Sequence, residues 1–343
     1  MLNQKTVPEL EKNAPKDQVI CDDARNLLGH FSAETFDCCV TSPPYFGLRD
    51  YGVEKQIGRE TSATEYVDSL TAIFRSVGVV LKKSGTLWVV IGDSYNAYKG
   101  NAKRSHADNA YVGVRGHPSR PSGYGLEEKS LKPKDLIGIP WMLAFALRAD
   151  GWYLRQEIIW HKPNAMPESI RDRCTKSHET IFMFAKQPRY YYDANAIREP
   201  CSEANIADFQ RRKTFTERSK GQSTYGEIRP DLYRRREEYM PKDFRKNKRD
   251  VWIVNTRSSK NTHFATYPES LITPCILAGC PPNGVVLDPF FGAGTTGIAA
   301  TKNNRHYVGI DINPNYCKLA KERIKKEQKQ PFHHKPAQEP YYP

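Results

Sequence analysis

Short apolar runs recur along the chain between polar, glycine-rich and proline-rich stretches, and this pattern predicts strands buried inside a domain. The run at 85–93 is continuously apolar and ends in Gly-Asp, which is typical of a parallel strand covered on both faces. The runs predict strands at residues 18–21, 36–41, 85–93, 152–160, 180–185, 285–291 and 307–311. The strands 152–160 and 180–185 are expected to pair as a hairpin.

Segments with the apolar spacing of helices lie between several of these strands. Residues 60–81 place their large apolar side chains on one helical face, and helices are also expected at 136–147 and 315–329. Alternating strands and helices predict an α/β fold, with a doubly wound, mostly parallel, Rossmann-like sheet.

Two segments depart from this pattern because they are basic and have little hydrophobic periodicity. Residues 96–134 and 195–250 each contain five more basic than acidic residues, and the second combines arginine clusters with aromatic residues. We interpret the first as a mobile loop beside the site, with a disordered insertion as the alternative. The second suits contacts with phosphates and bases, with a solvated charged helix as the alternative.

These changes in composition divide the chain into parts. The predicted division is one half-domain at 18–194 that includes the basic loop, a basic insertion at 195–255, and a second half-domain at 256–330. Residues 1–17 and 331–343 are polar and are expected to form loose tails.

Charge and cysteine usage narrow the class of protein. The formal net charge of +13 over 343 residues suggests a polyanionic partner. No apolar run approaches the length of a membrane span, and the N-terminal residues lack the apolar region of a signal peptide. The eight cysteines are scattered without a C-x-x-C pair, so we expect reduced thiols, no zinc site and a cytoplasmic location.

The stretch Ser42-Pro43-Pro44-Tyr45 follows the predicted strand 36–41 directly. Neither proline can donate a hydrogen bond to a sheet, so the chain must leave the strand in a stiff turn. Such a turn presents the Ser42 hydroxyl, backbone carbonyls and the Tyr45 ring at the mouth of the sheet. A planar heterocycle with an exocyclic amino group fits these groups, although a simple proline-rich strand exit is the plainer interpretation.

A second stretch has the pattern strand, glycine turn, helix, strand and acid. The strand containing Asp288-Pro289-Phe290 precedes Gly292-Ala293-Gly294-Thr295, and Asp311 ends the next strand 19 residues after Gly292. The pattern predicts a nucleoside-binding half of a doubly wound sheet, in which Asp311 binds ribose hydroxyls.

The glycine spacing also fits NAD, which leaves an NAD-linked dehydrogenase as an alternative. Asp288, however, favours a ligand bearing an amino group or a positive charge over a pyrophosphate, and so favours S-adenosyl-L-methionine. Asp22, at the end of the strand 18–21, is a further candidate to bind an amino group of the cofactor, and the alternative role for the pair Asp22-Asp23 is to cap a helix.

Together these motifs resemble the DNA amino-methyltransferases of the beta permutation class, in which the catalytic motif precedes the cofactor motif. Further matching stretches are 92–95, 159–164 and 263–269, and the resemblance spans about residues 18–325. It implies that His263 and Phe264 belong to the cofactor pocket and that the insertion 195–255 is a target-recognition region. It also makes the half-domain 18–194 catalytic and the half-domain 256–330 cofactor-binding.

The resemblance implies a mechanism for the turn at Ser42. The Ser42 hydroxyl and the Pro43 carbonyl would accept hydrogen bonds from the amino group and localise its lone pair, with no metal and no covalent enzyme intermediate. The base would be flipped out of the duplex and stacked on Tyr45, and also against Trp160 if that residue is not a core tryptophan. In this family serine at the first motif position favours N4 of cytosine, with N6 of adenine as the alternative.

The implied partner is double-stranded DNA, and the enzyme would be cytoplasmic and associated with the nucleoid. The candidate DNA contacts are Trp160, Lys162, Arg211, Arg212, Arg234, Arg235 and Arg236. A homodimer and a cognate restriction endonuclease are compatible with the resemblance. A DNA-binding protein with an inactive catalytic fold is the remaining alternative, and the net charge is its support.

Overall fold

The strands of the central sheet lie in the order β1-β10-β9-β2-β3-β5-β4-β8, in a computed structural model that describes residues 15–48, 51–96, 130–208, 211, 244–256 and 267–328. The bounds are β1 (Gln18–Cys21), β2 (Phe36–Thr41), β3 (Leu81–Ile91), β4 (Tyr153–His161), β5 (His178–Ala185), β8 (Val251–Ile253), β9 (Val285–Asp288) and β10 (His306–Asp311). Neighbouring strands are parallel except that β5 is antiparallel to both β3 and β4. The mostly parallel, doubly wound sheet is therefore confirmed.

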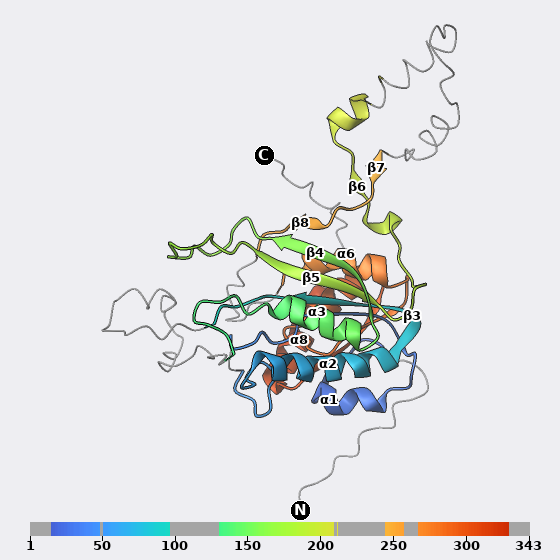
Figure 1. Ribbon diagram of the computed structural model, residues 1–343. Coiled ribbons are helices and arrows are strands. Elements are labelled where there is room, and N and C mark those ends of the chain that lie inside the picture. The colour runs from blue at the N-terminus through green and yellow to red at the C-terminus, as the bar shows by residue number, and fades with distance from the viewer. Residues whose placement is uncertain are drawn as a thin grey trace, which may run out of the picture. The chain divides into compact units, whose positions relative to one another are not determined.

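Helices cover both faces of the sheet (Figure 1). Their bounds are α1 (Ala24–Leu27), α2 (Ala63–Val80), α3 (Ile139–Ala149), α6 (Glu269–Gly279), α7 (Thr295–Lys302) and α8 (Pro314–Gln328). Helices α1, α2 and α3 share one hydrophobic cluster with side chains of β2, β3, β5, β9 and β10. Helix α6 contacts β2 and β3, and α7 contacts β9 and β10.

Alternating side chains of the central strands explain why both faces are buried. In β2, Cys38, Cys39 and Val40 are all fully buried. Cys39 belongs to the cluster shared with α2, whereas Cys38 points toward Gly279 at the end of α6. A strand that is apolar at successive positions thus supplies two cores, as expected for a parallel strand inside the sheet.

Local signals fix where α2 begins and ends. The Ser62 side chain caps the helix by accepting a hydrogen bond of 3.1 Å from the Glu65 backbone N–H, and the Glu65 carboxylate accepts one from the Thr61 hydroxyl. The cap satisfies a backbone donor that the first turn leaves open. The helix ends at Val80, and β3 starts at the next residue.

The chain forms two compact units, Asp193–Arg249 and the remainder. In the smaller unit, β6 (Glu199–Pro200) pairs antiparallel with β7 (Arg245–Lys246), and Glu199 pairs with Lys248 at 3.2 Å. The sequence placed residues up to 255 in the insertion, but β8 pairs with β4 in the main sheet, so the smaller unit ends at Arg249. Residues 1–14, 97–129, 212–243 and 329–343, which include most of the predicted basic loop and tails, lie outside the described residues.

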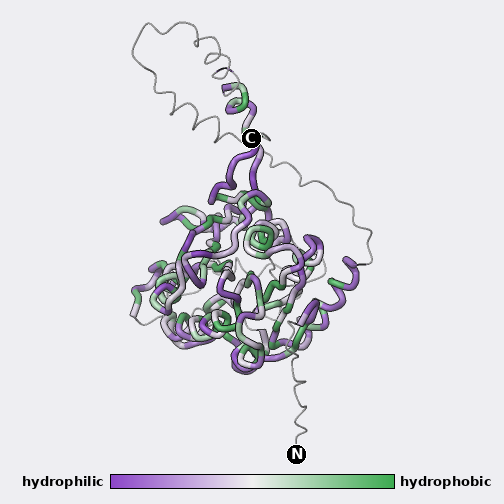
Figure 2. Tube along the Cα trace, turned by 90° about the vertical axis from the view of Figure 1, so that its right-hand side faces the viewer, coloured by the Kyte–Doolittle hydropathy of each residue, from purple (hydrophilic) through white to green (hydrophobic). Residues whose placement is uncertain are grey.

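Hydropathy varies along the chain in keeping with this burial (Figure 2). The described helices include none long and apolar enough to cross a membrane. Two elements of the main unit, α6 and β8, were not predicted from the sequence. Strand β8 is short, and its outer residues Val251 and Ile253 are about half exposed, so it has no long apolar run to mark it.

The reversal of strand order occurs between β9 and β2. From β9 the next strand along the chain lies on one side, and from β2 the next lies on the other. β2 and β9 pair directly, with Cys38 opposite Val286 and Cys39 opposite Leu287. Because the two strands are parallel, their carboxyl ends emerge side by side, and ligands of open α/β sheets bind at such a point.

The Gly309→Ala substitution is predicted to destabilise the fold. A Cβ atom at Gly309 would lie 2.2 Å from Cγ of Phe291, whose ring stacks on Tyr307 at 5.7 Å and also lies close to Gly297. The ring has little room to move, so we expect a loss of about 1–3 kcal/mol, the usual effect of overpacking. Urea denaturation measures it, with Gly29→Ala as the matched control because no atom lies within 4 Å of the added methyl group. Equal midpoints for the two variants would contradict this packing.

Candidate active site

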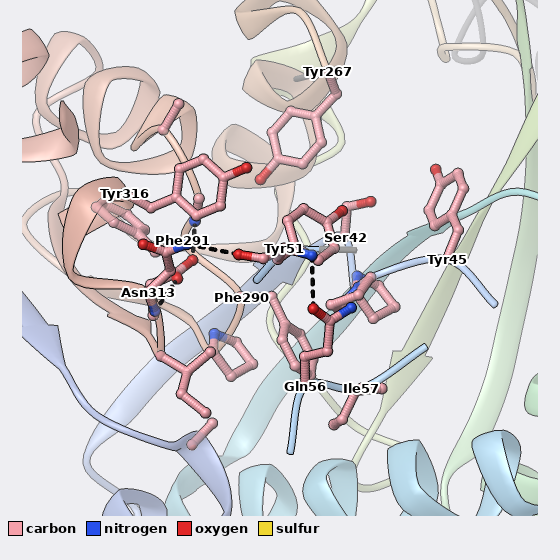
Figure 3. Close-up of a pocket in the computed structure, with 18 of the residues that line it drawn as sticks. Ser42, Tyr45, Tyr51, Gln56, Ile57, Tyr267, Phe290, Phe291, Asn313 and Tyr316 are labelled. Carbon is pink, nitrogen blue, oxygen red and sulfur yellow. Dashed lines mark hydrogen bonds between the residues drawn. The ribbon is translucent and has the colours of Figure 1, made fainter. Parts of the chain in front are cut away.

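A cavity of about 320 Å³ lies at the carboxyl ends of β2, β9 and β10. Its lining includes Ser42, Pro43, Pro44 and Tyr45 after β2, and Pro289, Phe290, Gly292 and Thr295 after β9, together with Asp311 at the end of β10. Figure 3 shows Ser42 and Tyr45 on one side of this cavity, with Asn313 and Tyr316 on the other. Tertiary structure therefore brings together two motifs that lie 250 residues apart (292 − 42 = 250).

The proline turn is held by its surroundings rather than by sheet hydrogen bonds. Pro43 is buried, and the Pro44 carbonyl accepts a hydrogen bond of 2.7 Å from the hydroxyl of Tyr66 in α2. Tyr66 is itself fully buried, so it anchors the turn to the hydrophobic core. The Ser42 side chain is half-buried at the cavity wall.

Tyr45 is fixed at both ends of its side chain. Its hydroxyl donates a hydrogen bond of 2.7 Å to Glu179 of β5, and its ring lies so close to Gly92 that a Cβ there would be 2.7 Å from a ring carbon. Burial raises the pKa of the Tyr45 hydroxyl well above its ordinary value, the Glu179 carboxylate adds to this, and a hydrogen bond with the Ser42 side chain opposes it. The Tyr45 ring is therefore held in one position at the cavity.

Trp160 and Lys162 line the same end of the cavity. The Trp160 ring is only 4% exposed and donates through Nε1 to the Val254 carbonyl at 2.8 Å. The Lys162 ammonium lies 4.2 Å from the centre of that ring and pairs with Glu179. One face of Trp160 is thus covered by Lys162, which leaves less room for a stacked base than the sequence suggested.

Asp288 lies beneath the cavity and is fully buried. Its carboxylate accepts hydrogen bonds from Thr41 at 2.6 Å, Thr296 at 2.5 Å and Tyr267 at 3.2 Å, and from the Phe290 backbone at 3.0 Å. Burial raises the pKa of Asp288 to about 6, and these hydrogen bonds oppose the effect. We expected direct contact with a positively charged ligand, but the carboxylate is used to join the ends of β2 and β9.

The glycine turn approaches the cavity with its backbone. Gly292 has φ +50 and donates its N–H to the Asp311 carboxylate at 2.7 Å. Gly294 has φ +80, and a Cβ there would lie 2.9 Å from that of Ala320 in α8, so this close packing requires glycine. The Thr295 hydroxyl is buried at the cavity wall and has no hydrogen-bond partner among the described residues.

Asp311 combines exposure to the cavity with backbone contacts. Its carboxylate accepts hydrogen bonds from the N–H groups of Gly292 and Asn313, the latter at 2.8 Å. Burial raises the pKa of Asp311, and the two backbone hydrogen bonds oppose the rise. Each carboxylate oxygen retains capacity to accept a further hydrogen bond from a ligand hydroxyl.

The neighbouring aspartates after β1 have different roles. Asp22 is not part of the cavity lining, and its carboxylate accepts the Asp23 N–H at 2.7 Å. Asp23 lines the cavity, caps α1 through the Arg25 N–H and pairs with the Arg25 side chain at 2.6 Å. The capping role therefore describes this pair better than the cofactor contact that we predicted for Asp22.

Several cavity residues were not predicted from the sequence. The segment after the proline turn supplies Tyr51, Gln56 and Ile57, and Gln56 accepts the Tyr51 N–H at 2.6 Å (Figure 3). Asn313 donates to the Tyr51 carbonyl at 3.2 Å, which joins this segment to the end of β10. The glycine- and aromatic-rich composition of 46–52 was a local signal, but no pattern marked Asn313 or Glu179.

Some predicted residues cannot be placed at the cavity. His263, Phe264, Arg212, Arg234, Arg235 and Arg236 lie outside the described residues. Arg211 is described and exposed, and it belongs to the smaller unit. Among the described residues, no cluster of three or more His, Cys, Asp or Glu could hold a metal ion.

The cavity joins two kinds of chemistry. One end presents a hydroxyl, a fixed aromatic ring and a carboxylate–ammonium pair, which suits a planar polar ring. The other end presents an acid after β10, backbone groups of a glycine turn and a threonine hydroxyl that no described residue contacts, which suits a nucleoside. Two ligands held in this way would meet near Ser42 and Phe290, where the two strand ends lie together.

Known proteins share this arrangement over most of the chain. The N6_N4_Mtase family model, described as DNA methylase, matches residues 36–322. The type II methyltransferase M.SmaI of Serratia marcescens is 44% identical over 92% of this chain and 93% of its own. M.Cfr9I of Citrobacter freundii, also named a type II methyltransferase, is 44% identical over 89% of this chain and 86% of its own.

Solved structures share the fold. PvuII DNA methyltransferase, described as cytosine-N4-specific, has a TM-score of 0.58 at 16% identity and covers 92% of each chain. A DNA modification methylase of Thermus thermophilus, TTHA0409, was solved with S-adenosyl-L-methionine. It has a TM-score of 0.52 at 23% identity, covering 90% of this chain and 95% of its own.

The raised pKa of Asp288 predicts a specific pH dependence of stability. A carboxyl whose pKa is about 6 when folded and about 4 when unfolded stabilises the fold most when protonated. Its contribution is fully present below about pH 4 and is lost as the pH rises to about 6. We therefore expect the stability of the wild type relative to Asp288→Asn to fall over this window, by a difference on the order of 3 kcal/mol.

Urea midpoints of both proteins between pH 4 and 7.5 measure this difference. Asp172→Asn is the control, because Lys134 lowers the pKa of this exposed carboxyl and so reverses the sign of its smaller effect. A difference between wild type and Asp288→Asn that does not change with pH would contradict the assignment.

Proposed function

The chain belongs to the DNA methylase family of amino-methyltransferases, and we propose that it transfers a methyl group from S-adenosyl-L-methionine to N4 of a cytosine in double-stranded DNA. The main support is the meeting of Ser42–Tyr45 with the glycine turn around one cavity at the reversal of strand order. Membership of this family removes the case for an NAD-linked dehydrogenase, for which the proline turn has no role.

The cofactor end of the cavity fits S-adenosyl-L-methionine in three respects. Asp311 has acceptor capacity for ribose hydroxyls, and Ile57 and Tyr316 give apolar surface for a purine ring. The buried Thr295 hydroxyl lacks a partner among the described residues, and a polar ligand would satisfy it. The S-adenosyl-L-methionine complex of the structurally similar TTHA0409 is additional support.

S-adenosyl-L-methionine supplies a methyl group on a positively charged sulfur, which is open to attack by a nucleophile. An exocyclic amine is a weak nucleophile because its lone pair is delocalised into the ring. The Ser42 oxygen and the Pro43 carbonyl are acceptors that can take hydrogen bonds from the two amino hydrogens. Such contacts favour a lone pair localised on nitrogen, and the rigid turn holds them in place before the reaction.

The base must leave the duplex to reach this cavity, because its amino group is enclosed by the helix. Tyr45 offers a fixed ring for the extruded base, held by Glu179 and Gly92. We propose that Lys162 lies near the DNA strand that enters the cavity. The basic segment around Arg211 and the arginines at 212 and 234–236 are proposed to contact the duplex, since phosphate contacts position a protein on DNA.

Cytosine is favoured over adenine by the hydroxyl at Ser42, where adenine enzymes of this family more often have an acid or amide. The structurally similar PvuII enzyme, which is described as cytosine-N4-specific, is consistent with this choice. The 44% identity to M.SmaI and M.Cfr9I supports a role as the modification enzyme of a type II restriction-modification system. A cognate endonuclease is part of that proposal.

The product identifies the target base directly. Double-stranded DNA treated with the enzyme and S-adenosyl-L-methionine, then digested to nucleosides, should contain N4-methylcytosine by mass spectrometry. Ser42→Ala should reduce the single-turnover rate by about 10²-fold or more, as expected for loss of one preorganised contact to the reacting group, with cofactor affinity retained. N6-methyladenine as the sole product would overturn the choice of base, and full activity of Ser42→Ala would remove this residue from the mechanism.

Gly92→Ala tests the fixed position of Tyr45. The added Cβ would lie 2.7 Å from the Tyr45 ring, which cannot retreat without losing the hydrogen bond to Glu179. We expect a single-turnover rate about 10-fold lower or more, because small misplacements of positioning groups have large effects. Calorimetric titration should show unchanged cofactor affinity, since Gly92 lies outside the cavity lining. Gly29→Ala is the control, and equal rates for the two variants would contradict the role of the ring.

A further inference from the structure

Glu179 is a half-buried acid at the active site that neither the motifs nor the proposed chemistry use. It lies on β5 and lines the cavity together with the turn at Ser42. One carboxylate oxygen accepts the Tyr45 hydroxyl proton at 2.7 Å, and the other pairs with the Lys162 ammonium. Side chains of both Glu179 and Lys162 are less than one-fifth exposed, so this is a largely desolvated ion pair.

These contacts extend to the reacting group. Ser42 and Tyr45 form a hydrogen bond between their side chains, so a continuous chain runs from Ser42 through Tyr45 to Glu179 and Lys162. Lys162 also lies over the Trp160 ring, which restricts where its ammonium can sit. The chain is therefore held from its far end by a buried tryptophan.

The chemistry of each group sets the direction of this chain. An ionised carboxylate only accepts hydrogen bonds, and a lysine ammonium only donates them. The single hydroxyl proton of Tyr45 is thus directed to Glu179, and the Tyr45 oxygen is left to accept from Ser42. With its own proton directed to Tyr45, the Ser42 oxygen has its lone pairs available to other donors.

We propose that Glu179 is a positioning residue that fixes this direction and so presents the Ser42 oxygen to the target amino group as a hydrogen-bond acceptor. The inference rests on the proposed function, because it concerns how Ser42 meets an amino group. A serine hydroxyl can donate or accept, unlike a carboxylate. Serine at this position therefore needs an outside group to select its acceptor state, and Glu179 with Lys162 supplies it.

Glu179→Gln reverses the chain without changing its size. Because the Lys162 ammonium needs an acceptor, the amide oxygen of the new side chain would face Lys162 and its NH₂ would face Tyr45. Tyr45 would then donate to Ser42, whose proton would point at the amino group. We expect the single-turnover methylation rate to fall by about 10²-fold, with cofactor affinity unchanged, as for other lost preorganised contacts.

Lys162→Met in the Glu179→Gln background should restore part of the rate. Without the ammonium, the amide is free to rotate and accept the Tyr45 proton again, so the double variant should be several-fold faster than Glu179→Gln alone. A residue that only supports the fold would not give this rescue. In a Tyr45→Phe background, where the chain is broken, adding Glu179→Gln should have little further effect on the rate.

Single-turnover methylation of duplex DNA, measured for each variant with its melting temperature and cofactor affinity, completes the test. Asp172→Asn, the corresponding change in an exposed ion pair, is the control and should match the wild type. A Glu179→Gln rate within twofold of wild type, an absent rescue, or effects of Tyr45→Phe and Glu179→Gln that simply multiply would each overturn the inference. If Glu179→Gln does not fold, a folded Lys162→Met/Glu179→Gln protein as slow as Ser42→Ala overturns it equally.

The same experiment separates this inference from the proposed function. A wild-type protein that methylates no amino group in DNA refutes the proposed function. A wild-type protein that methylates DNA, with an additive mutant cycle and no rescue, refutes only the role of Glu179.

Discussion

The buried hydrogen bond from Thr41 to Asp288 holds the two halves of the active site together. Thr41 is the last residue of β2 and Asp288 the last of β9, and both are fully buried. Ser42 and Pro289 follow them directly, so one contact sets the separation of the catalytic turn from the glycine turn. Leaving either partner unsatisfied in this environment would cost about 1–3 kcal/mol or more.

Asp288 shows how a residue that looks like a ligand contact can serve the scaffold. Its carboxylate receives hydrogen bonds from β2, α7 and the segment before α6 as well as from its own loop. The acceptor capacity that could bind a charged ligand is used within the protein. The raised pKa reflects the burial that this central position requires. Asp311, at the next strand end, faces the cavity instead and keeps capacity for a ligand.

The catalytic end of the cavity depends on a second set of buried polar contacts. Tyr66 holds the Pro44 carbonyl, Glu179 holds Tyr45, and Gly92 leaves room for the Tyr45 ring. These groups come from α2, β5 and the end of β3, and none is adjacent to the turn in sequence. The turn supplies the reactive groups, and distant elements determine how those groups are aimed.

The strands, most helices and the two motifs could be predicted from local sequence, because apolar periodicity, prolines and glycines act over short distances. The bounds of β1 and β2 agree with prediction, whereas β8 and α6 escaped because a short edge strand and a proline-containing helix have weak local patterns. The division of labour between Asp288, Asp22 and Asp23 was beyond sequence reasoning, since burial and hydrogen-bond partners depend on which strands become neighbours. The same holds for Glu179, which reaches Tyr45 only because β5 pairs antiparallel with β3, the strand next to β2.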